Sequence, residues 1–314
     1  MHANSPPSWA VVSTIKAPAR DVLRFAAHHL EAGATRLHIY LDEPNPDALP
    51  HLQAHPQIRV ITCGGWYWKQ LDKPRPATHQ RRQTINATHA YYRAGADWLT
   101  HIDVDEFLWS EQPIADLLAT LPDTLPSALV APLERLSGRA DHYKAAVPET
   151  PERDETTRQI YPGYSGLMKA GFMSHTKGKC FARTGLRNIR FHIHAILQAG
   201  EPVRTGRYMD NVDLCHHHCD SWDQWRQSFD YRLHHGSYRP DLSANKSRLL
   251  GGLNKHEVMR IILEEQGEDG LRSFFDAVTA ADPQVFQRLC DQGLIRKRVL
   301  DLDAKLARHF PEFP

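Results

Sequence analysis

The chain has 314 residues, with 38 lysines and arginines against 37 aspartates and glutamates and a formal net charge of +1. This length suffices for one large domain or two smaller ones, and the balanced charge excludes the strongly basic class of nucleic-acid-binding proteins. Five cysteines without regular spacing favour a reducing compartment over a disulfide framework. The first residues lack a basic region followed by an apolar run, and no stretch is long enough to span a bilayer, so we expect a cytoplasmic protein. Peripheral contact with the inner face of a membrane, and oligomer formation, stay open.

Strands and helices alternate along the first 132 residues. Apolar, β-branched runs predict strands at 9–16, 36–42, 57–62, 128–132 and from residue 98 onward. Helical spacing predicts helices at 18–33, 79–94 and 113–121, and the glycine–aromatic run 64–69 is expected to be a loop. This alternation predicts a parallel sheet with helices on both faces, in which ligands bind beyond the carboxyl ends of the strands.

The second half of the chain has a different pattern. Residues 136–179 are polar and rich in turn formers, which predicts a long irregular segment of functional or mobile character. Strands are expected near 180–182 and 189–194. Ser221 is a good N-cap for a helix, and further helices are predicted at 254–265, 269–280, 283–291 and 296–309.

Three carboxylates within four residues follow the apolar run that begins at Trp98. In an extended segment, residues two apart point to the same face, so Asp103 and Asp105 can converge on one divalent cation. Mg²⁺ and Mn²⁺ prefer oxygen ligands and commonly bridge to substrate phosphates. The alternative is an acidic turn without a ligand.

Other polar and aromatic residues also fall at predicted carboxyl ends of strands. Lys16 and Asp42 follow the first two strands. Three consecutive aromatics at 66–68 cannot all be core, so at least one should line a cleft and stack on a nucleobase or sugar ring. Basic side chains near them would suit a pyrophosphate, although a solvated surface charge is the preferred explanation for each one alone. They are Lys69, Arg75, Arg81 and Arg82.

Histidines gather in two places. The run Cys215–Cys219 has no second cysteine pair, which disfavours a structural zinc, and only His216 and His218 can share a face. One histidine from this run that completes the metal site of the aspartates is the preferred interpretation, with incidental histidines as the alternative. His192 and His194 share one face of a predicted strand and either approach a phosphate or sugar hydroxyl or face solvent.

Several catalytic motifs are absent from the sequence. It contains no Gly-x-x-x-x-Gly-Lys-Ser/Thr loop, and no Gly-x-Gly-x-x-Gly follows the first strand. A Gly-x-Ser-x-Gly elbow is also missing. The sequence therefore disfavours P-loop NTPases, dinucleotide oxidoreductases and serine hydrolases of the α/β type.

Together these segments resemble a bacterial glycosyltransferase of the family 2-like group, with a GT-A fold and a DxD-type motif. The likeness extends over about residues 9–230, and two downstream segments, 179–183 and 214–225, match the family more loosely. His217 stands where the family usually has tyrosine, and Asp220 where it usually has a basic residue. The segments that carry the resemblance are 12–17, 28–33, 39–42 and 98–108.

The resemblance implies a metal-dependent glycosyltransferase that moves a hexosyl or related group from a nucleotide-sugar donor to a hydroxyl of a glycan or lipid-linked acceptor. It implies a role in cell-surface polysaccharide or glycolipid synthesis, a GT-A-like domain at 1–220 and a helical extension at 221–314 packed on it. Mn²⁺ or Mg²⁺ would assist the departure of the nucleoside diphosphate. The implied metal ligands are Asp103, Asp105 and His216.

Donor contacts are predicted at the strand ends and on the aromatic and basic segments described above. They are Thr14, Lys16, Asp42, Trp68, Lys69, Arg81, Asp103, Lys179 and His194. An inverting enzyme needs a general base near the acceptor hydroxyl. The candidates for that base are Asp213, Asp210 and Glu106.

Two rival functions use the same residues. A metal-dependent phosphohydrolase of the haloacid-dehalogenase type would carry its nucleophile on the first strand, with threonine or valine two residues after the second aspartate. Here the motif lies on about the fourth strand and that position is Phe107. A non-catalytic sugar- or nucleotide-binding module is the other rival, and the intact pair of aspartates disfavours it.

Overall fold

The structure is a computed structural model that describes residues 5–203, 208–218, 220–242 and 252–314. The chain forms two compact units. Unit 1 comprises residues 1–131, 177–214 and 300–314, and unit 2 comprises residues 132–176 and 215–299. Both units are therefore discontinuous in sequence. The predicted division at residue 220 stays a prediction.

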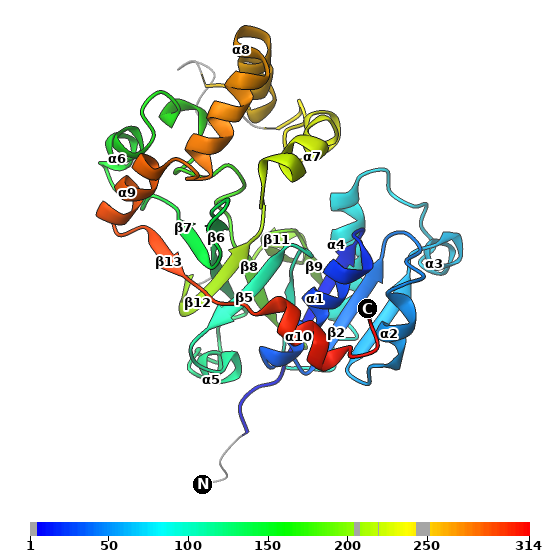
Figure 1. The fold of residues 1–314 in the computed structure, drawn as a ribbon. Coiled ribbons are helices and arrows are strands. Elements are labelled where there is room, and N and C mark those ends of the chain that lie inside the picture. The colour runs from blue at the N-terminus through cyan, green and yellow to red at the C-terminus, as the bar shows by residue number, and fades with distance from the viewer. Residues whose placement is uncertain (1–4, 204–207, 219, 243–251) are drawn as a thin grey trace. The chain divides into compact units, whose positions relative to one another are not determined.

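Unit 1 is built on a central β-sheet flanked by helices (Figure 1). Its strands lie in the order β6-β8-β4-β1-β2-β3. Pairing is parallel from β4 to β3, and β8 continues the sheet antiparallel to β4, with β6 antiparallel to β8. The strands are β1 (Trp9–Ile15), β2 (Arg36–Leu41), β3 (Ile58–Thr62), β4 (Trp98–His101), β8 (Lys179–Arg183) and β6 (Ser127–Arg135), the last of which ends in unit 2.

The predicted α/β class, with a central sheet flanked by helices, is confirmed, but the prediction that parallel pairing extends through residues 128–132 is wrong. An additional strand, β5 (Glu106–Ser110), follows the acidic motif directly, before the short helix α5 (Ile114–Ala119). The strand β8 lies between β4 and β6 and runs antiparallel to both, so β6 has the direction of β4 but pairs antiparallel with its neighbour. Alternation of strands and helices along the sequence cannot show this insertion.

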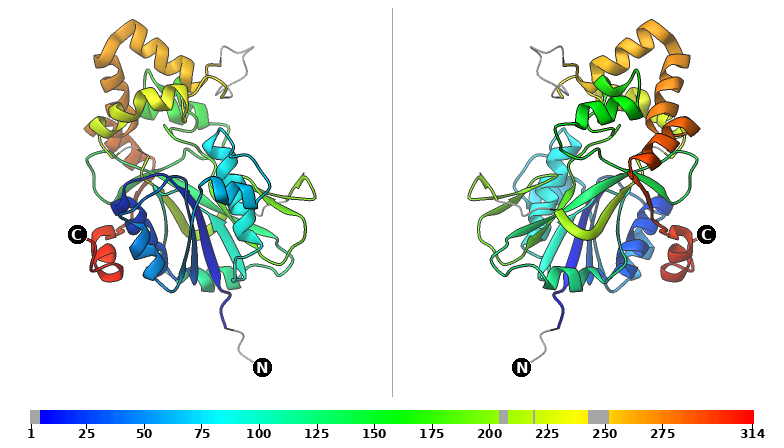
Figure 2. Two further views of the ribbon diagram at one scale, coloured as in Figure 1. Left: turned by 90° about the vertical axis from the view of Figure 1, so that its right-hand side faces the viewer. Right: turned by 90° about the vertical axis from the view of Figure 1, so that its left-hand side faces the viewer.

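Helices cover both faces of the sheet in unit 1. In Figure 2, the blue helix α1 (Ala19–Glu31) and the red helix α10 (Leu302–His309) lie on one side of the strands, and the cyan helix α4 (His79–Tyr91) lies on the other. Alternate apolar residues of β1 and β4 pack with the apolar face of α4, because neighbouring residues of a strand point to opposite faces. These residues include Ala10, Val12, Leu99, Ala87 and Ala90.

Two short helices, a small sheet and the strand β12 complete unit 1. The helix α2 (Leu49–Ala54) follows β2, and the segment predicted to be an aromatic loop is instead the helix α3 (Gly65–Gln70). A small antiparallel sheet is formed by β9 (Ile189–Phe191), β10 (Ile196–Gln198) and β11 (Glu201–Pro202). The predicted strand 189–194 therefore ends early, and His192 and His194 lie beyond it. The strand β12 (Tyr208–His216) pairs with β5 and ends in unit 2.

The last helix, α10, packs against α1 through charged pairs. Asp303 accepts hydrogen bonds from Arg24 and Arg20, and Arg308 forms an ion pair with Glu31. The helix predicted at 296–309 is thus wrong at its start, because residues 295–297 form the strand β13 (Ile295–Lys297). That strand pairs with β7 (His142–Ala145) in unit 2.

Unit 2 is mainly helical. Its helices are α6 (Arg153–Ile160), α7 (Trp222–His234), α8 (Lys255–Val278) and α9 (Pro283–Asp291), with the short 3₁₀ helix η1 (Ser165–Leu167). The segment 136–179 was predicted to be irregular, but it contains β7 and α6. Ser221 caps α7 as expected, since its side chain accepts a hydrogen bond from the backbone of Gln224. The two predicted helices 254–265 and 269–280 are the halves of α8, which bends at Gly267, where φ is 66°.

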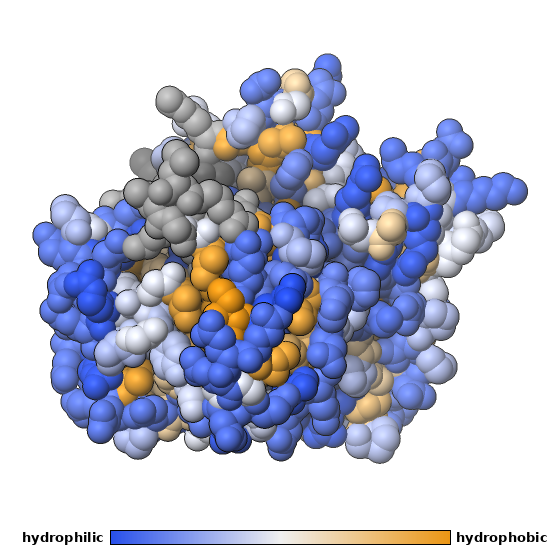
Figure 3. Space-filling view, turned by 90° about the horizontal axis from the view of Figure 1, so that it is seen from above, coloured by the Kyte–Doolittle hydropathy of each residue, from blue (hydrophilic) through white to orange (hydrophobic). Residues whose placement is uncertain are grey.

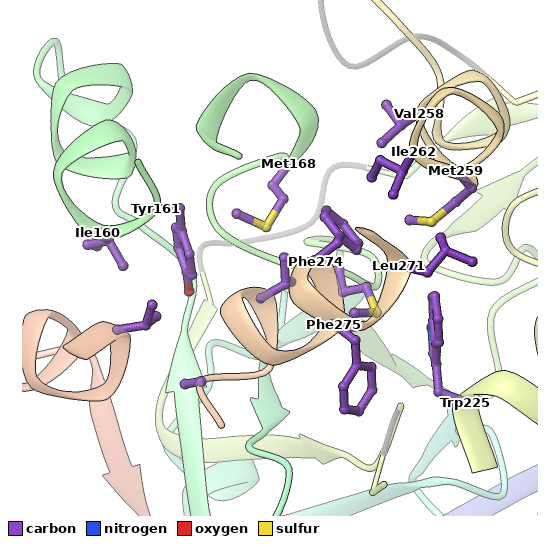
Figure 4. Packing of buried hydrophobic residues seen from close by; sticks show 14 of the residues in the cluster. Ile160, Tyr161, Met168, Trp225, Val258, Met259, Ile262, Leu271, Phe274 and Phe275 are labelled. Atoms are coloured by element: carbon purple, nitrogen blue, oxygen red, sulfur yellow. The ribbon is translucent and has the colours of Figure 1, made fainter. Parts of the chain in front are cut away.

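The core of unit 2 is rich in aromatic and methionine side chains (Figure 4). Trp225 from α7 packs on Phe275 from α8, with ring centroids 5.5 Å apart. Beneath this core, Glu134 of β6 lies opposite Lys144 of β7, and the two buried side chains form an ion pair at 3.2 Å.

Hydrophilic residues dominate the face shown in Figure 3, with apolar residues gathered in small patches between them. Among the helices of the described part of the chain, none combines the length and the apolar character needed to cross a bilayer.

Candidate functional site

One face of α4 lies over the carboxyl ends of three neighbouring strands in unit 1. His79, Arg82, Gln83 and Asn86 are spaced i, i+3, i+4 and i+7, so they lie on the same side of the helix. Their side chains hydrogen-bond to residues at the ends of β2, β4 and β1. Arg82, Gln83 and Asn86 are buried. This polar face of α4 is the frame of the candidate site.

The end of β2 carries Asp42, a buried carboxylate surrounded by basic side chains. Arg82 donates from Nε to Oδ1 at 2.8 Å and from a terminal nitrogen to Oδ2 at 2.7 Å. Arg75 donates to Oδ1 at 3.1 Å, and the ring of His79 lies 3.2 Å from Oδ2. Burial raises the pKa of Asp42, but hydrogen bonds and charges from His79 and Arg82 outweigh it and hold the pKa well below its usual range. Asp42 therefore stays ionised.

The end of β1 is linked to the same helix. Thr14 Oγ1 accepts a hydrogen bond from Asn86 Nδ2 at 3.0 Å, and Tyr67 donates to Asn86 Oδ1 at 2.7 Å. Two residues later, the exposed Lys16 forms an ion pair with Glu43 at 2.7 Å. A cavity of about 350 Å³ opens here, lined by residues 15–18 and 43–45. Predicted donor-binding residues of the first two strands thus do lie together.

The acidic motif at the end of β4 forms a turn. The backbone N–H of Glu106 donates to the carbonyl of Asp103 at 3.0 Å, and the N–H of Asp103 donates back to Glu106 Oε2 at 2.9 Å. The expectation of an extended segment, in which Asp103 and Asp105 share a face by alternation, is therefore wrong, because these reciprocal bonds fold the chain back on itself. Asp103 and Asp105 are both half-buried.

A buried lysine neutralises part of this motif. Lys179, the first residue of β8, lies with Nζ 2.7 Å from Asp103 Oδ2 and 3.2 Å from Glu106 Oε2. Gln83 of α4 donates to the other oxygen of Asp103. The side chains of Lys179 and Glu106 are fully buried. Burial lowers the pKa of Lys179, but the charges of Asp103 and Glu106 outweigh it and raise the pKa above its ordinary value, so Lys179 stays cationic.

The position of Lys179 depends on the glycine before it. A Cβ added at Gly178 would lie 1.7 Å from the carbonyl oxygen of Val130 on β6. The carbonyl of Gly178 lies 3.0 Å from Nδ1 of His194. The predicted donor-binding residue His194 therefore contacts the backbone just before β8. Only glycine permits this close approach of the two strands.

The acidic motif fits a hard divalent cation. Its three carboxylates, those of Asp103, Asp105 and Glu106, lie within four residues, and Lys179 contacts two of them. Carboxylate oxygens are the ligands that Mg²⁺ and Mn²⁺ prefer. Each oxygen has two lone pairs, so Asp103 can hold a cation while it accepts from Lys179 and Gln83.

The aromatic and basic residues after β3 divide into buried and exposed ones. Trp68 is buried, and its Nε1 donates to the carbonyl of Cys63 at 3.0 Å. Trp66 is instead 73% exposed. The predicted donor contacts Lys69 and Arg81 are both exposed. Arg82, the neighbour of Arg81, reaches the end of β2 instead, as does Arg75.

The candidates for the general base have different surroundings. Glu106 is engaged by Lys179 and by the turn, whereas Asp210 is exposed and Asp213 is half-buried on β12.

Three histidines of unit 2 pack on one another. The ring of His216, at the end of β12, stacks on His175 at 5.1 Å and meets His218 edge-on at 5.3 Å. This confirms that His216 and His218 lie on one side. His217 points elsewhere, with its ring nitrogens 2.8 Å from the hydroxyl of Tyr143 and 3.1 Å from Arg135. Cys219 lies outside the described residues.

Three residues of the site, His79, Gln83 and Asn86, were not predicted from the sequence. The detectable signal was a polar stripe at i, i+3, i+4 and i+7 within a helix otherwise predicted only from its apolar residues. A buried polar stripe on a helix beside a sheet must be hydrogen-bonded, so it points to partners at the strand ends.

Comparison with known proteins agrees with this architecture. The model of glycosyltransferase family 92 matches residues 12–241, which include all of the strand ends described above. The chain belongs to glycosyltransferase family 92. This confirms the predicted relationship to glycosyltransferases. The family model that matches is that of family 92, whereas the sequence resemblance pointed to the family 2-like group. A search of curated proteins found no match for this family 92 member.

Among solved structures, the family 92 chain is similar to the galactosyltransferase LgtC in complex with donor and acceptor sugar analogs. The TM-score is 0.27 and the sequence identity is 14%; the match covers 55% of this chain and 57% of LgtC, a little over half of each.

Proposed function

We propose that this protein is a metal-dependent glycosyltransferase that uses a nucleotide-sugar donor and transfers the sugar to a hydroxyl of a glycan or lipid-linked acceptor. The single observation that carries the proposal is the polar face of α4. Its side chains hydrogen-bond to Asp42 in its basic surroundings at the end of β2, to Thr14 on β1 and to the acidic motif at the end of β4. Membership of a glycosyltransferase family supports the reaction class.

The charges at the two strand ends suit the two parts of a metal-bound diphosphate. Asp42 is outnumbered by Arg75, Arg82 and His79, so the end of β2 favours an anion. Asp103 and Asp105 leave the end of β4 negative, which favours Mn²⁺ or Mg²⁺. Thr14 and Lys16 lie between these ends, beside the 350 Å³ cavity, where the nucleoside would bind. When bound, the cation would stabilise the charge that develops on the departing nucleoside diphosphate.

The acceptor hydroxyl needs a group that removes its proton if the enzyme inverts. Asp213 and Asp210 remain candidates for this base because both keep solvent access. Glu106 fits less well, because its buried carboxylate is held by Lys179. His216 is proposed as a further metal or phosphate ligand. Transfer to a cell-surface polysaccharide or glycolipid is the proposed biological role.

The decisive experiment measures thermal stabilisation by a panel of nucleotides and nucleotide sugars with and without Mn²⁺. A ligand at 100 times its Kd should stabilise the folded chain by about 2.7 kcal/mol. We expect stabilisation by one nucleoside diphosphate and its sugars, in the presence of metal only. No stabilisation by any of them would contradict the proposal, and turnover of a phosphatase panel would then favour a phosphohydrolase.

Variants assign the metal ligands in the same assay. Asp105→Ala should abolish the metal-dependent shift while the unliganded melting temperature stays unchanged, and Asp123→Ala, on an exposed turn, is the matched control. His216→Ala should reduce the Mn²⁺-dependent shift if this histidine is a ligand. An Asp105→Ala protein with wild-type nucleotide affinity would remove the central role of the acidic motif.

A further inference from the structure

Unit 1 contains a second, larger cavity beside β3. Its volume is about 590 Å³, within the range of small-molecule sites in proteins. It lies between β3, the helix α3 and the last turns of α4. Its lining includes Ile61, Trp66, Tyr67, Gln70, His89 and Arg93.

The wall formed by β3 is a sheet edge. β3 pairs with β2 on one side, and in the part of the chain that the structure describes no strand pairs with its other side. An edge strand presents backbone N–H and C=O groups that can bond to hydroxyl groups of a ligand.

Trp66 presents a large apolar ring at the mouth of this cavity. Its side chain is 73% exposed, although the next two residues, Tyr67 and Trp68, are buried and fix α3 on the core. Tyr67 donates to Asn86 and Trp68 donates to the carbonyl of Cys63. The indole is therefore held by an anchored helix and is not part of a loose loop.

The opposite wall supplies polar groups of fixed orientation. The hydroxyl of Tyr40 lies 2.7 Å from Nδ1 of His89, and the rings of Tyr40 and Tyr67 meet the imidazole edge-on at 5.9 Å. Burial lowers the pKa of His89, followed by the charge of Arg93, so the ring is neutral near pH 7. The tautomer with hydrogen on Nε2 accepts from Tyr40 at Nδ1 and offers a donor, and the other tautomer donates to Tyr40 and offers an acceptor; a ligand hydroxyl can bond to either. Arg93 offers further donors.

From this geometry we propose that the cavity binds a neutral saccharide unit of the acceptor glycan. An exposed indole stacks on the apolar face of a pyranose ring, while His89, Arg93, Gln70 and the β3 edge bond to its hydroxyls. The lining residues include no carboxylate, which disfavours a cationic ligand.

The cavity is distinct from the proposed donor site. Arg82 and His89 are seven residues apart on α4, which corresponds to about 10 Å along the helix axis. One helix thus carries the donor-side polar face at its first turns and this cavity at its last. The assignment of the saccharide as part of the acceptor rests on the proposed function, whereas binding itself can be tested without turnover.

Saturation-transfer NMR on the full chain, without donor or metal, tests the binding. The probes are four neutral disaccharides: maltose, cellobiose, lactose and chitobiose. We expect one or more to bind, and Trp66→Ala to weaken that binding about tenfold, the cost of losing a stacking contact. Tyr231→Ala removes another exposed aromatic, 63% exposed in unit 2, and should leave binding unchanged.

Two results would overturn the inference: no disaccharide binds the wild-type chain, or Trp66→Ala binds as tightly as wild type. In active enzyme, Trp66→Ala should raise the KM for a long acceptor with kcat unchanged, and should not affect an acceptor too short to reach the cavity. Donor binding measured by the Mn²⁺-dependent thermal shift should be the same in Trp66→Ala and wild type. Loss of the saccharide site would thus be distinguished from failure of the proposed transferase function.

Discussion

The ends of β2 and β4 occupy equivalent positions on either side of β1 but have opposite charge. At the end of β2, one carboxylate, Asp42, is surrounded by Arg75, Arg82 and His79. At the end of β4, three carboxylates lie within four residues, and the cation Lys179 contacts two of them, Asp103 and Glu106. Two strands separated by one neighbour lie about 10 Å apart. A parallel sheet can therefore hold an anion site and a cation site side by side at one edge.

The comparison also shows how each site tolerates its buried charge. Asp42 is overcompensated by cations, so it is ionised and its neighbours keep positive charge to spare. Asp103 and Glu106 instead share the buried ammonium of Lys179. Breaking each arrangement should therefore have a different cost.

The largest effect is expected from Lys179→Met. It leaves buried Glu106 and half-buried Asp103 without their cation, and breaking a buried ion pair by removing one partner costs about 3–5 kcal/mol. Urea denaturation would measure this loss. Adding Glu106→Gln should restore part of it, because one uncompensated charge is removed, and Lys69→Met on the exposed side of α3 is the control. A stable Lys179→Met protein would contradict the role of Lys179 as a structural counter-ion.

The next largest effect is expected from acid, because buried His29 and buried Asp42 should lower the unfolding free energy in different pH ranges. Burial lowers the pKa of His29 to about 4, so its neutral form is favoured in the folded chain. The unfolded chain binds a proton below about pH 6.5, and stability should fall by about 3 kcal/mol per such histidine between pH 6.5 and 4. Asp42 has a lowered pKa, so its stabilisation is present above about pH 4 and is lost only in stronger acid.

The contribution of His29 is measured from the pH dependence of the unfolding free energy. His29→Gln should flatten the curve between pH 4 and 6.5, and His192→Gln, an exposed histidine, should not. A decline confined to pH below 4 would show that carboxylates, and not His29, dominate acid unfolding.

Arg82→Met should cost less than Lys179→Met, about 2 kcal/mol, because Asp42 keeps Arg75 and His79 after its strongest partner is removed. Arg81→Met is the matched control: the adjacent residue on the same helix is exposed and should change stability by less than about 0.5 kcal/mol. Nucleotide affinity should fall in Arg82→Met and not in Arg81→Met. Equal effects of the two variants would show that the orientation of the α4 face is wrong.

The smallest effect is expected from Gln83→Leu, about 1 kcal/mol, because it removes one hydrogen-bond donor from Asp103 and leaves Lys179 in place. Gln53→Leu, on the exposed side of α2, is the control. A loss as large as that of Lys179→Met would show that Gln83, and not the lysine, holds the acidic turn.

Much of unit 1 followed from the sequence, since β1, α1, β2, β3 and α4 are long, periodic and separated by turn residues. The acidic motif was located correctly, but its turn was not foreseen, because the bonds between Asp103 and Glu106 depend on a reciprocal geometry that alternation does not encode. The roles of Gln83 and Lys179 were missed for another reason: contacts between residues about 20 and 76 positions apart depend on how the chain folds back. The insertion of β8 between β4 and β6 is equally non-local.

The return of the chain from unit 2 to α10 has a consequence for synthesis. Asp303 and Arg308 bind α1, and 279 residues separate Arg24 from Asp303, so α10 is synthesised long after α1. At about 5–20 residues per second, α1 is exposed for tens of seconds before its partner helix is available. Until then the charged side of α1 that carries Arg24 and Glu31 is uncovered, so a ribosome-bound chain ending at residue 299 should be more susceptible to proteases at α1 than the finished protein.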